Sequence, residues 1–328
     1  MTQHAPAASG RLQLPGLALR DPARPRRHLL SILDLSPAEV LYLARRAVRI
    51  KHAPADLPTL RGKTVGVYFR KSSTRTRTGF TVGAGRLGAT VVTFGPGDLQ
   101  TSTGETLEDT ARTLAGYLDV LVMRTNEGVE EMRAFAAHPS MSVVNALSAD
   151  EHPTQALADL STMLEHFGRL EGLHLLYLGE GNKTAAALAL AMSRLPGMRL
   201  TLATPAGYGL DAGKLAAARA LAAEHGASVE QTHDAGALPA GVDVVYTSRW
   251  QEMGVGRPDP EWKAGFAPFR VTQALMDRVA GPACVFMHDL PAVRGEDVDD
   301  AVLDGARSLA WVQAQHKMWS AMAVMEWC

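Results

Sequence analysis

Four cations and several small hydroxyl residues crowd the stretch YFRKSSTRTRTGF, residues 68–80. An apolar run typical of a buried strand, KTVGVYF, leads into it, and a helical pattern follows. Helix-start N–H groups, the Arg75 guanidinium and the hydroxyls of Ser73, Thr74 and Thr76 could converge on one phosphate. The glycines and GK[ST] of a Walker loop are missing. We therefore predict a phosphate site of another kind, against the alternative of a helix start with solvated arginines.

Other segments place polar residues where strands end or helices begin. Arg124 closes the strand-like run DVLVMR, and HDLP, residues 288–291, closes the run ACVFMH. In EHPTQALAD, His152 and Gln155 stand three apart on a first helical turn, so they share one face and could hold a carbonyl or amide. Taken alone, each has an ordinary alternative: a surface arginine, a capping histidine or a simple turn.

Composition limits the class of protein. The chain has 328 residues, 46% of them hydrophobic, and a net charge of −1, which is enough for two cores but gives no basic footprint for nucleic acid. Cys284 and Cys328 are too few for a disulfide framework and lack CxxC spacing. No apolar run approaches the length of a membrane span. We expect a cytoplasmic protein with no membrane, nucleic-acid or metal partner.

Short β-branched runs alternate with longer helical stretches along most of the chain. This rhythm predicts an α/β protein of two doubly wound parallel-sheet domains with a cleft between them. The helical pattern TQALADLSTMLEHFG lies between the two sets of βα units and should connect them. We predict a flexible N-terminal tail over 1–27, a first domain over 28–149 joined by a C-terminal helix over 312–328, and a second domain over 150–311.

The phosphate segment, the strand-end arginine, HPxQ and H-x-L-P, in this order and at these separations, resemble the aspartate/ornithine carbamoyltransferase family. The resemblance runs from about residue 28 to the end and includes HLLSILDLSPAEV and ETLEDTAR. It implies an enzyme that transfers the carbamoyl group of carbamoyl phosphate to the amine of an ornithine-like amino acid and releases phosphate. It also implies a first domain that binds carbamoyl phosphate, a second that binds the acceptor, and no cofactor.

The resemblance carries roles to individual residues. It implies a carbamoyl phosphate site of Ser73, Thr74, Arg75, Thr76, Gln100, Arg124, His152, Gln155, Leu290 and Lys317. Within this site, residues 73–76 would hold the phosphate, and Arg124, His152 and Gln155 the carbamoyl group. The Leu290 carbonyl would orient the carbamoyl NH2. The candidate catalytic residues are Arg75, Arg124, His152, Gln155, Asp289 and Lys317.

Gln100, in GDLQTSTGET, matches a loop residue that ornithine enzymes lend to the next subunit. The resemblance therefore implies a homotrimer with shared active sites. The tail LPAVRGEDVDDAVLDGARS is similar to the acetylornithine and succinylornithine branch, which usually has a Pro-rich knot-forming loop. Because LGEGNKTAAALAL contains no such loop, we expect no knot.

The acceptor side departs from the ornithine pattern. The segment D-x-x-x-S-M-G of the family stands here as SRWQEMG, and H-C-L-P has become HDLP, so one carboxylate is lost and another gained. Lys317 stands in place of the family's C-terminal arginine. The residues that the resemblance assigns to the acceptor are Lys183, Ser248, Arg249, Glu252, Met253 and Asp289. This set suits a zwitterion with its charged groups spaced differently from those of ornithine.

Three other interpretations compete with an ornithine acceptor. The acceptor could be an acetylated or succinylated ornithine, or an amine of a specialised pathway. The chain could also be a catalytically weak paralogue that binds carbamoyl phosphate, since lysine does not replace the planar fork of arginine. A dinucleotide fingerprint at Gly179-Glu180-Gly181 is disfavoured because Thr184 takes the place of its last glycine.

Overall fold

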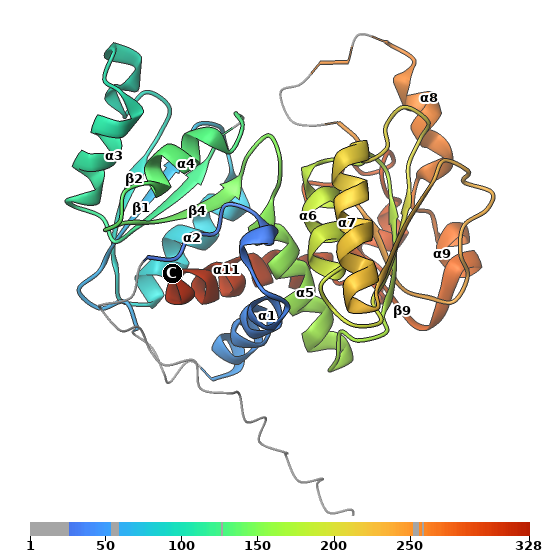
Figure 1. Ribbon diagram of the computed structural model, residues 1–328. Coiled ribbons are helices and arrows are strands. Elements are labelled where there is room, and N and C mark those ends of the chain that lie inside the picture. The colour runs from blue at the N-terminus through green and yellow to red at the C-terminus, as the bar shows by residue number, and fades with distance from the viewer. Residues whose placement is uncertain (1–25, 54–58, 126, 252–255, 258) are drawn as a thin grey trace, which may run out of the picture.

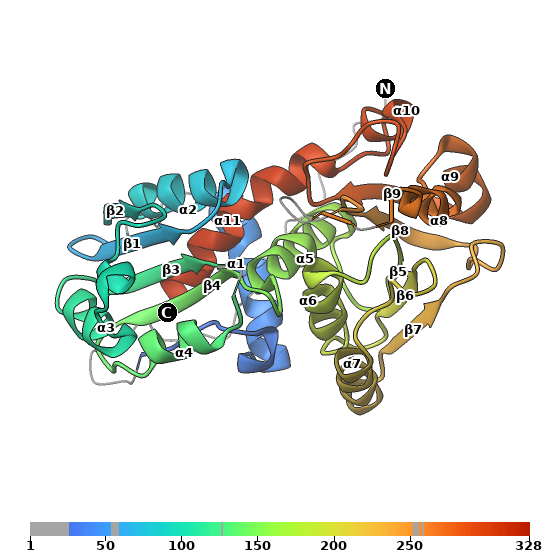
Figure 2. The same ribbon diagram turned by 90° about the horizontal axis from the view of Figure 1, so that it is seen from above.

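The computed structural model describes residues 26–53, 59–125, 127–251, 256–257 and 259–328. Two lobes, each built on a parallel sheet, lie side by side (Figures 1 and 2). The elements of the first lobe and its connections are η1 (Ile32–Asp34), α1 (Pro37–His52), β1 (Thr64–Phe69), α2 (Thr74–Arg86), β2 (Thr90–Phe94), η3 (Gln100–Thr103), α3 (Leu107–Ala115), β3 (Val120–Arg124), α4 (Glu130–Ala136), β4 (Ser142–Leu147) and α5 (Pro153–Phe167).

The second lobe repeats the alternation of strands and helices. Its elements are β5 (His174–Leu178), α6 (Lys183–Met192), β6 (Arg199–Ala203), α7 (Ala212–His225), β7 (Ser228–Thr232), β8 (Val242–Thr247), α8 (Trp262–Phe266), η4 (Ala267–Phe269), α9 (Gln273–Val279), β9 (Ala280–His288), α10 (Asp300–Leu303) and α11 (Ala310–Trp327).

Both sheets have a topological switch point. The first has the strand order β2-β1-β3-β4 and the second β7-β6-β5-β8-β9, and all their pairings are parallel. The chain therefore leaves β1 and β3 in opposite directions, as it does β5 and β8, which opens a crevice at their carboxyl ends. The loops that follow these strands carry the predicted phosphate and acceptor segments.

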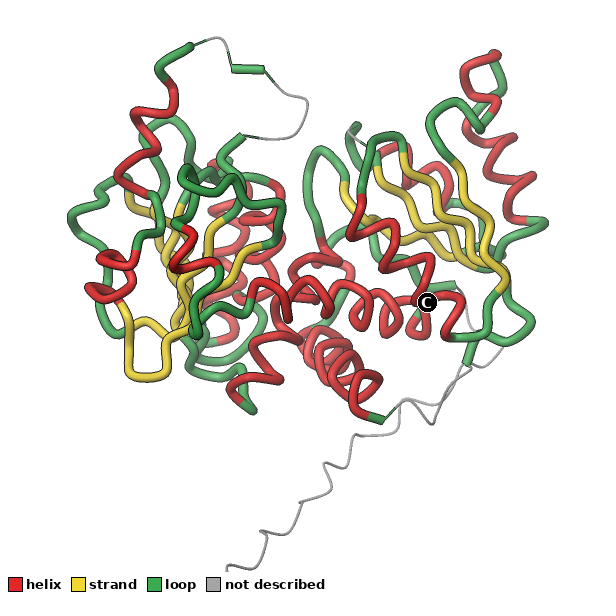
Figure 3. Tube along the Cα trace, turned by 180° about the vertical axis from the view of Figure 1, so that it is seen from behind, coloured by secondary structure: helices red, strands yellow, loops and turns green. Residues whose placement is uncertain are grey.

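Helices α1, α5 and α11 fill the middle of the molecule. Helix α5 connects the lobes, and α11 packs against α1, α2 and α5 (Figures 2 and 3). All side chains from Pro153 to Met163 of α5 are buried, so this helix has no solvated face near its start. The polar side chains of that turn can therefore face only a buried network or an enclosed site.

Local sequence explains where key helices begin. Helix α1 begins at a capping box, in which Ser36 accepts from the Glu39 N–H while Glu39 accepts from the Ser36 N–H, and Pro37 takes the first helical position. Asn182 caps α6 by accepting from the N–H groups of Thr184 and Ala185. These caps define where helices α1 and α6 begin.

The predicted fold class is confirmed. The connection from β5 to α6 consists of residues 179–182 and holds no knot-forming insertion. Gly181 has a packing role instead of a dinucleotide-binding one, since a Cβ there would lie 2.2 Å from the Leu210 nitrogen. Strand β7 and the short helices α4, α8, α9 and α10 were not predicted, because they are brief or polar. The described helices include none with the length and hydropathy of a membrane span.

The predicted domain limits stay a prediction. Most of the proposed tail lies outside the described residues. Arg26 belongs to the predicted tail, but its side chain donates a hydrogen bond to Asp119 Oδ1 at 3.1 Å. Residue 26 is therefore attached to the first lobe.

Candidate active site

A cavity of about 500 Å³ lies where the two lobes meet, and most of the predicted residues line it. Its walls come from the carboxyl ends of β1, β3, β4, β5, β8 and β9, the first turn of α2 and the middle of α11. The lining residues are Lys71, Ser72, Ser73, Thr74, Arg75, Thr76, Arg124, Leu147, His152, Asn182, Lys183, Thr184, Ser248, Arg249, Gln251, Asp289, Leu290, Pro291 and Lys317.

The phosphate segment forms the start of α2. Ser73 is the N-cap residue but makes no side-chain cap bond, so the first N–H groups of this 13-residue helix are not capped by its hydroxyl. That hydroxyl instead accepts from Arg124 Nη1 at 3.2 Å. Burial lowers the pKa of Arg75, and Asp289 opposes the shift. The helix dipole, free donors and cations together favour an anion here.

His152 and Gln155 lie together at the start of α5. His152 is buried and lines the cavity, and burial followed by the charges of Lys317 and Arg124 lowers its pKa well below the usual range. It is therefore a neutral ring at physiological pH. Gln155, three residues further along the chain, is fully buried, and its Oε1 atom has no hydrogen-bond partner among the described residues. Since buried polar atoms are normally hydrogen-bonded, this amide oxygen is suited to accept from an N–H group of a ligand.

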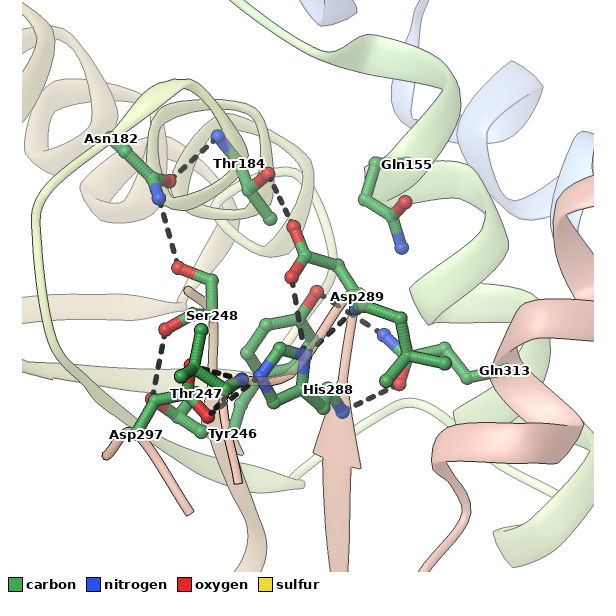
Figure 4. Close-up of polar contacts among 12 residues, drawn as sticks. Gln155, Asn182, Thr184, Tyr246, Thr247, Ser248, His288, Asp289, Asp297 and Gln313 are labelled. Atoms are coloured by element: carbon green, nitrogen blue, oxygen red, sulfur yellow. Dashed lines mark hydrogen bonds and ion pairs between the residues drawn. The ribbon is translucent and has the colours of Figure 1, made fainter. Parts of the chain in front are cut away.

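Asp289 and Lys317 bring opposite charges to the same cavity. Asp289 Oδ2 accepts from Thr184 Oγ1 at 2.9 Å, which joins the HDLP turn to the start of α6 (Figure 4). Burial lowers the pKa of Lys317, while Asp289 raises it. Asp289 is the one carboxylate among the described lining residues. Asp289 is therefore the described carboxylate that could form an ion pair with the ammonium group of an acceptor.

Ser248 stands where the resemblance places the acceptor-binding aspartate, and its hydroxyl is hydrogen-bonded within the protein. Its buried hydroxyl lies 2.6 Å from the Tyr177 hydroxyl and accepts from Asn182 Nδ2 at 2.9 Å (Figure 4). These contacts tie β5, α6 and β8 together at the second switch point. A neutral, satisfied hydroxyl cannot replace a carboxylate as a counter-ion.

The HDLP turn lines the cavity, and its backbone is fixed by hydrogen bonds. The Leu290 N–H donates to His288 Nδ1 at 2.8 Å, and the His288 N–H donates to Gln313 Oε1 at 2.7 Å. The peptide bond from Leu290 to Pro291 is cis. Both N–H groups are therefore hydrogen-bonded within the protein, while Asp289, Leu290 and Pro291 line the cavity.

Among the predicted residues, Gln100 lies apart from this group. Gln100 is exposed on η3 and does not line the cavity; its side chain accepts from Thr103 Oγ1 at 3.2 Å. Glu252 and Met253 lie outside the described residues. Asn182 and Thr184 line the cavity without having been predicted, although both stand next to Lys183 in the segment GEGNKT.

Comparisons with known proteins agree with this arrangement. Residues 27–165 match the family model "Aspartate/ornithine carbamoyltransferase, carbamoyl-P binding domain", and residues 171–328 match the model of the "Asp/Orn binding domain". The chain is 40% identical over 304 residues to an ornithine carbamoyltransferase of Anoxybacillus flavithermus, covering 91% of this chain and 95% of that protein. It is 39% identical over 303 residues to that of Methanothermobacter thermautotrophicus, covering 92% and 98%.

A solved structure gives the same result. The ornithine carbamoyltransferase from Pyrococcus furiosus superimposes with a TM-score of 0.86 at 36% identity, covering 91% of this chain and 96% of that one. The proteins matched here are named ornithine carbamoyltransferases, which does not favour acylated ornithine or a weak paralogue. The two family models together span nearly all the described residues. The chain belongs to the aspartate/ornithine carbamoyltransferase family.

Proposed function

We propose that this protein transfers the carbamoyl group of carbamoyl phosphate to the side-chain amine of an ornithine-like amino acid. One observation carries the proposal: a helix start without a side-chain cap and cations from both lobes surround a cavity whose described lining includes one acid. Carbamoyl phosphate is a compact anion with a polar NH2 group at its far end. The start of α2 suits its phosphate, and the neutral ring of His152 suits its carbonyl. The Gln155 amide oxygen, which lacks a donor among the described residues, suits its NH2.

The reaction requires charge stabilisation more than covalent help. The neutral amine attacks the carbonyl carbon, negative charge grows on the carbonyl oxygen, and the carbon–oxygen bond to phosphate then breaks. Arg124, with His152 beside it, stabilises the carbonyl oxygen, while Arg75 and Lys317 stabilise the departing phosphate. The phosphate keeps the bonding electron pair and accepts the amine proton. Positioning by both lobes supplies the remaining rate enhancement.

Asp289 receives the amine of the acceptor in this scheme. It is the described acid of the cavity, and Thr184 holds one of its oxygens. A carboxylate beside the nucleophile attracts the ammonium form, so the amine must lose its proton before attack. The transfer rate should therefore rise toward alkaline pH until the cations of the site begin to lose charge.

Asp289→Asn should lower kcat/KM for the acceptor by roughly 10- to 100-fold, since it removes a hydrogen-bonded counter-ion. Binding of a carbamoyl phosphate analogue should stay equal or tighten, because a negative charge near the anion has gone. The measurement compares ornithine, 2,4-diaminobutyrate and lysine by steady-state kinetics, and phosphonoacetamide by calorimetry. Asp277→Asn, at an exposed acid on α9, is the matched control. Equal loss for acceptor and analogue would contradict this role.

We further propose a homotrimer in which Gln100 completes the active site of the next subunit. Its exposed position on η3, away from the cavity of its own chain, supports this. A Gln100→Ala chain and a His152→Ala chain should each be impaired. After they are unfolded and refolded together, about a quarter of the sites in random trimers should be intact. Each variant refolded alone is the control. Mixtures no more active than the separate variants, or an active monomer in sedimentation, would exclude a shared site.

A further inference from the structure

One buried acid outside the cavity connects several parts of the proposed site. Asp159, one turn after Gln155 on α5, has no solvent exposure. Its Oδ1 accepts from Gln155 Nε2 at 2.7 Å and from Gln313 Nε2 at 2.7 Å, and its Oδ2 accepts from the Tyr246 hydroxyl at 3.2 Å. Helices α5 and α11 and strand β8 therefore meet at a single carboxylate.

Burying a carboxylate is unfavourable, and burial raises the pKa of Asp159. The hydrogen bonds from Gln155 and Gln313 lower that pKa and so favour the ionised form. Apolar side chains such as leucine or methionine would fill the same space at a lower cost in folding free energy. All three neighbours donate to the carboxylate, however, and an ionised carboxylate can only accept. Its chemistry therefore dictates which end of each neighbouring amide faces it.

The amide orientation set by Asp159 affects two groups near the cavity, one through Gln155 and one through Gln313. With its nitrogen held by Asp159, Gln155 must turn Oε1 away, and that oxygen is the buried atom without a described partner. Gln313, held in the same way, must also turn Oε1 away, and it accepts from the His288 N–H at 2.7 Å (Figure 4). His288 in turn holds the Leu290 N–H of the HDLP turn at 2.8 Å.

We propose that Asp159 is a positioning residue that sets the polarity of the Gln155 and Gln313 amides, so that acceptor oxygens of Gln155 and the HDLP turn face the NH2 of carbamoyl phosphate. This rests on the proposed function, since it assumes that the ligand carries such an NH2. The consequence is selectivity. The site should distinguish NH2 from a methyl group of similar size, because two buried acceptors without a donor are costly.

Two stable ligands isolate that selectivity. Phosphonoacetamide and 2-oxopropylphosphonate share the phosphonate and the carbonyl and differ only in NH2 against CH3. The wild type should bind the amide at least about tenfold more tightly, since one of the two hydrogen bonds alone implies that factor. In Asp159→Leu the Gln155 amide is free to rotate, and the preference should fall to near unity. Inorganic phosphate, which contacts only the start of α2, should bind with its wild-type affinity.

Two further variants separate orientation from general damage to the core. Tyr246→Phe removes a hydroxyl that donates to Asp159 and accepts from Gln313 Nε2, each at 3.2 Å. Both amides keep their 2.7 Å hydrogen bonds to Asp159, so the preference should persist. Adding Gln155→Glu to Asp159→Leu should restore it, because a carboxylate presents an acceptor whichever way it turns. If Asp159→Leu does not fold, Asp159→Ser takes its place, since a hydroxyl both donates and accepts and cannot fix the polarity.

The results distinguish this proposal from the proposed function. A wild type that binds neither phosphonate would refute the carbamoyl phosphate site itself. A wild type with the expected preference, together with a folded Asp159→Leu that keeps it, would refute the role of Asp159 alone. Equal loss in Tyr246→Phe would show that the preference depends on core packing and would also overturn the assignment.

Discussion

Arg75→Ala should abolish measurable turnover while leaving the fold intact. Arg75 lies in the first turn of α2, lines the cavity and is half-buried, so it carries no core packing that alanine would destroy. Loss of one charge-assisted contact to a charged ligand costs about 1.5–3 kcal/mol, or roughly 10- to 150-fold in affinity. The effect on kcat is expected to add about 10²- to 10³-fold, because the same cation stabilises charge that develops on the leaving phosphate.

Calorimetry with phosphonoacetamide and steady-state kinetics measure the two effects of Arg75→Ala separately, and thermal unfolding checks the fold. Arg77→Ala is the matched control, since Arg77 lies two residues on in the same helix but does not line the cavity. Its affinity and turnover should remain within about twofold of the wild type, as expected for a surface change. Unchanged affinity in Arg75→Ala would show that the start of α2 is not the phosphate site.

The grouping of the proposed phosphate-binding residues at one helix start could be predicted from sequence because it is local. A buried strand, a short polar turn and a helix start follow one another directly, so Ser73, Thr74 and Arg75 are brought together by the chain itself. The same holds for His152 and Gln155 on one turn of α5. Residues separated by a few positions in a regular element need no knowledge of tertiary structure to be placed side by side.

The network behind the site could not be predicted in the same way. Asp159 stands four residues after Gln155, a spacing that puts both on one face, but an acid near a helix start ordinarily faces solvent. Only the crossing of α11 over α5 brings Gln313 to it. Ser248 and Asn182 likewise meet because β5 and β8 are neighbours in the sheet, an arrangement that the order of elements in the chain does not specify.

Lys317 should make the binding of carbamoyl phosphate analogues unusually sensitive to alkaline pH. Its side chain is on α11 and faces Asp289, Asp159, Arg75 and Arg124, and burial lowers its pKa from 10.5 to about 8. A lysine whose pKa is lowered loses its positive charge as pH rises through that lower value. Affinity for a dianionic ligand should then fall by up to about tenfold per pH unit above about 8, until the pKa of the bound state is reached.

Lys317→Arg tests this directly, because a guanidinium stays protonated throughout the accessible range. The ratio of the Lys317→Arg to the wild-type affinity for phosphonoacetamide should be nearly constant below pH about 7 and should rise steadily above pH about 8. Taking the ratio at each pH cancels the ionisation of the ligand, and His152 adds no charge because its own pKa is lowered. Calorimetry in buffers of different ionisation enthalpy should also detect more proton uptake on binding by the wild type than by Lys317→Arg. Lys263→Arg, at an exposed lysine paired with Glu296, serves as the control. If the affinities of the wild type and Lys317→Arg for phosphonoacetamide change with pH in parallel, another group supplies the titrating charge. Lys317 would then have no electrostatic role in ligand binding.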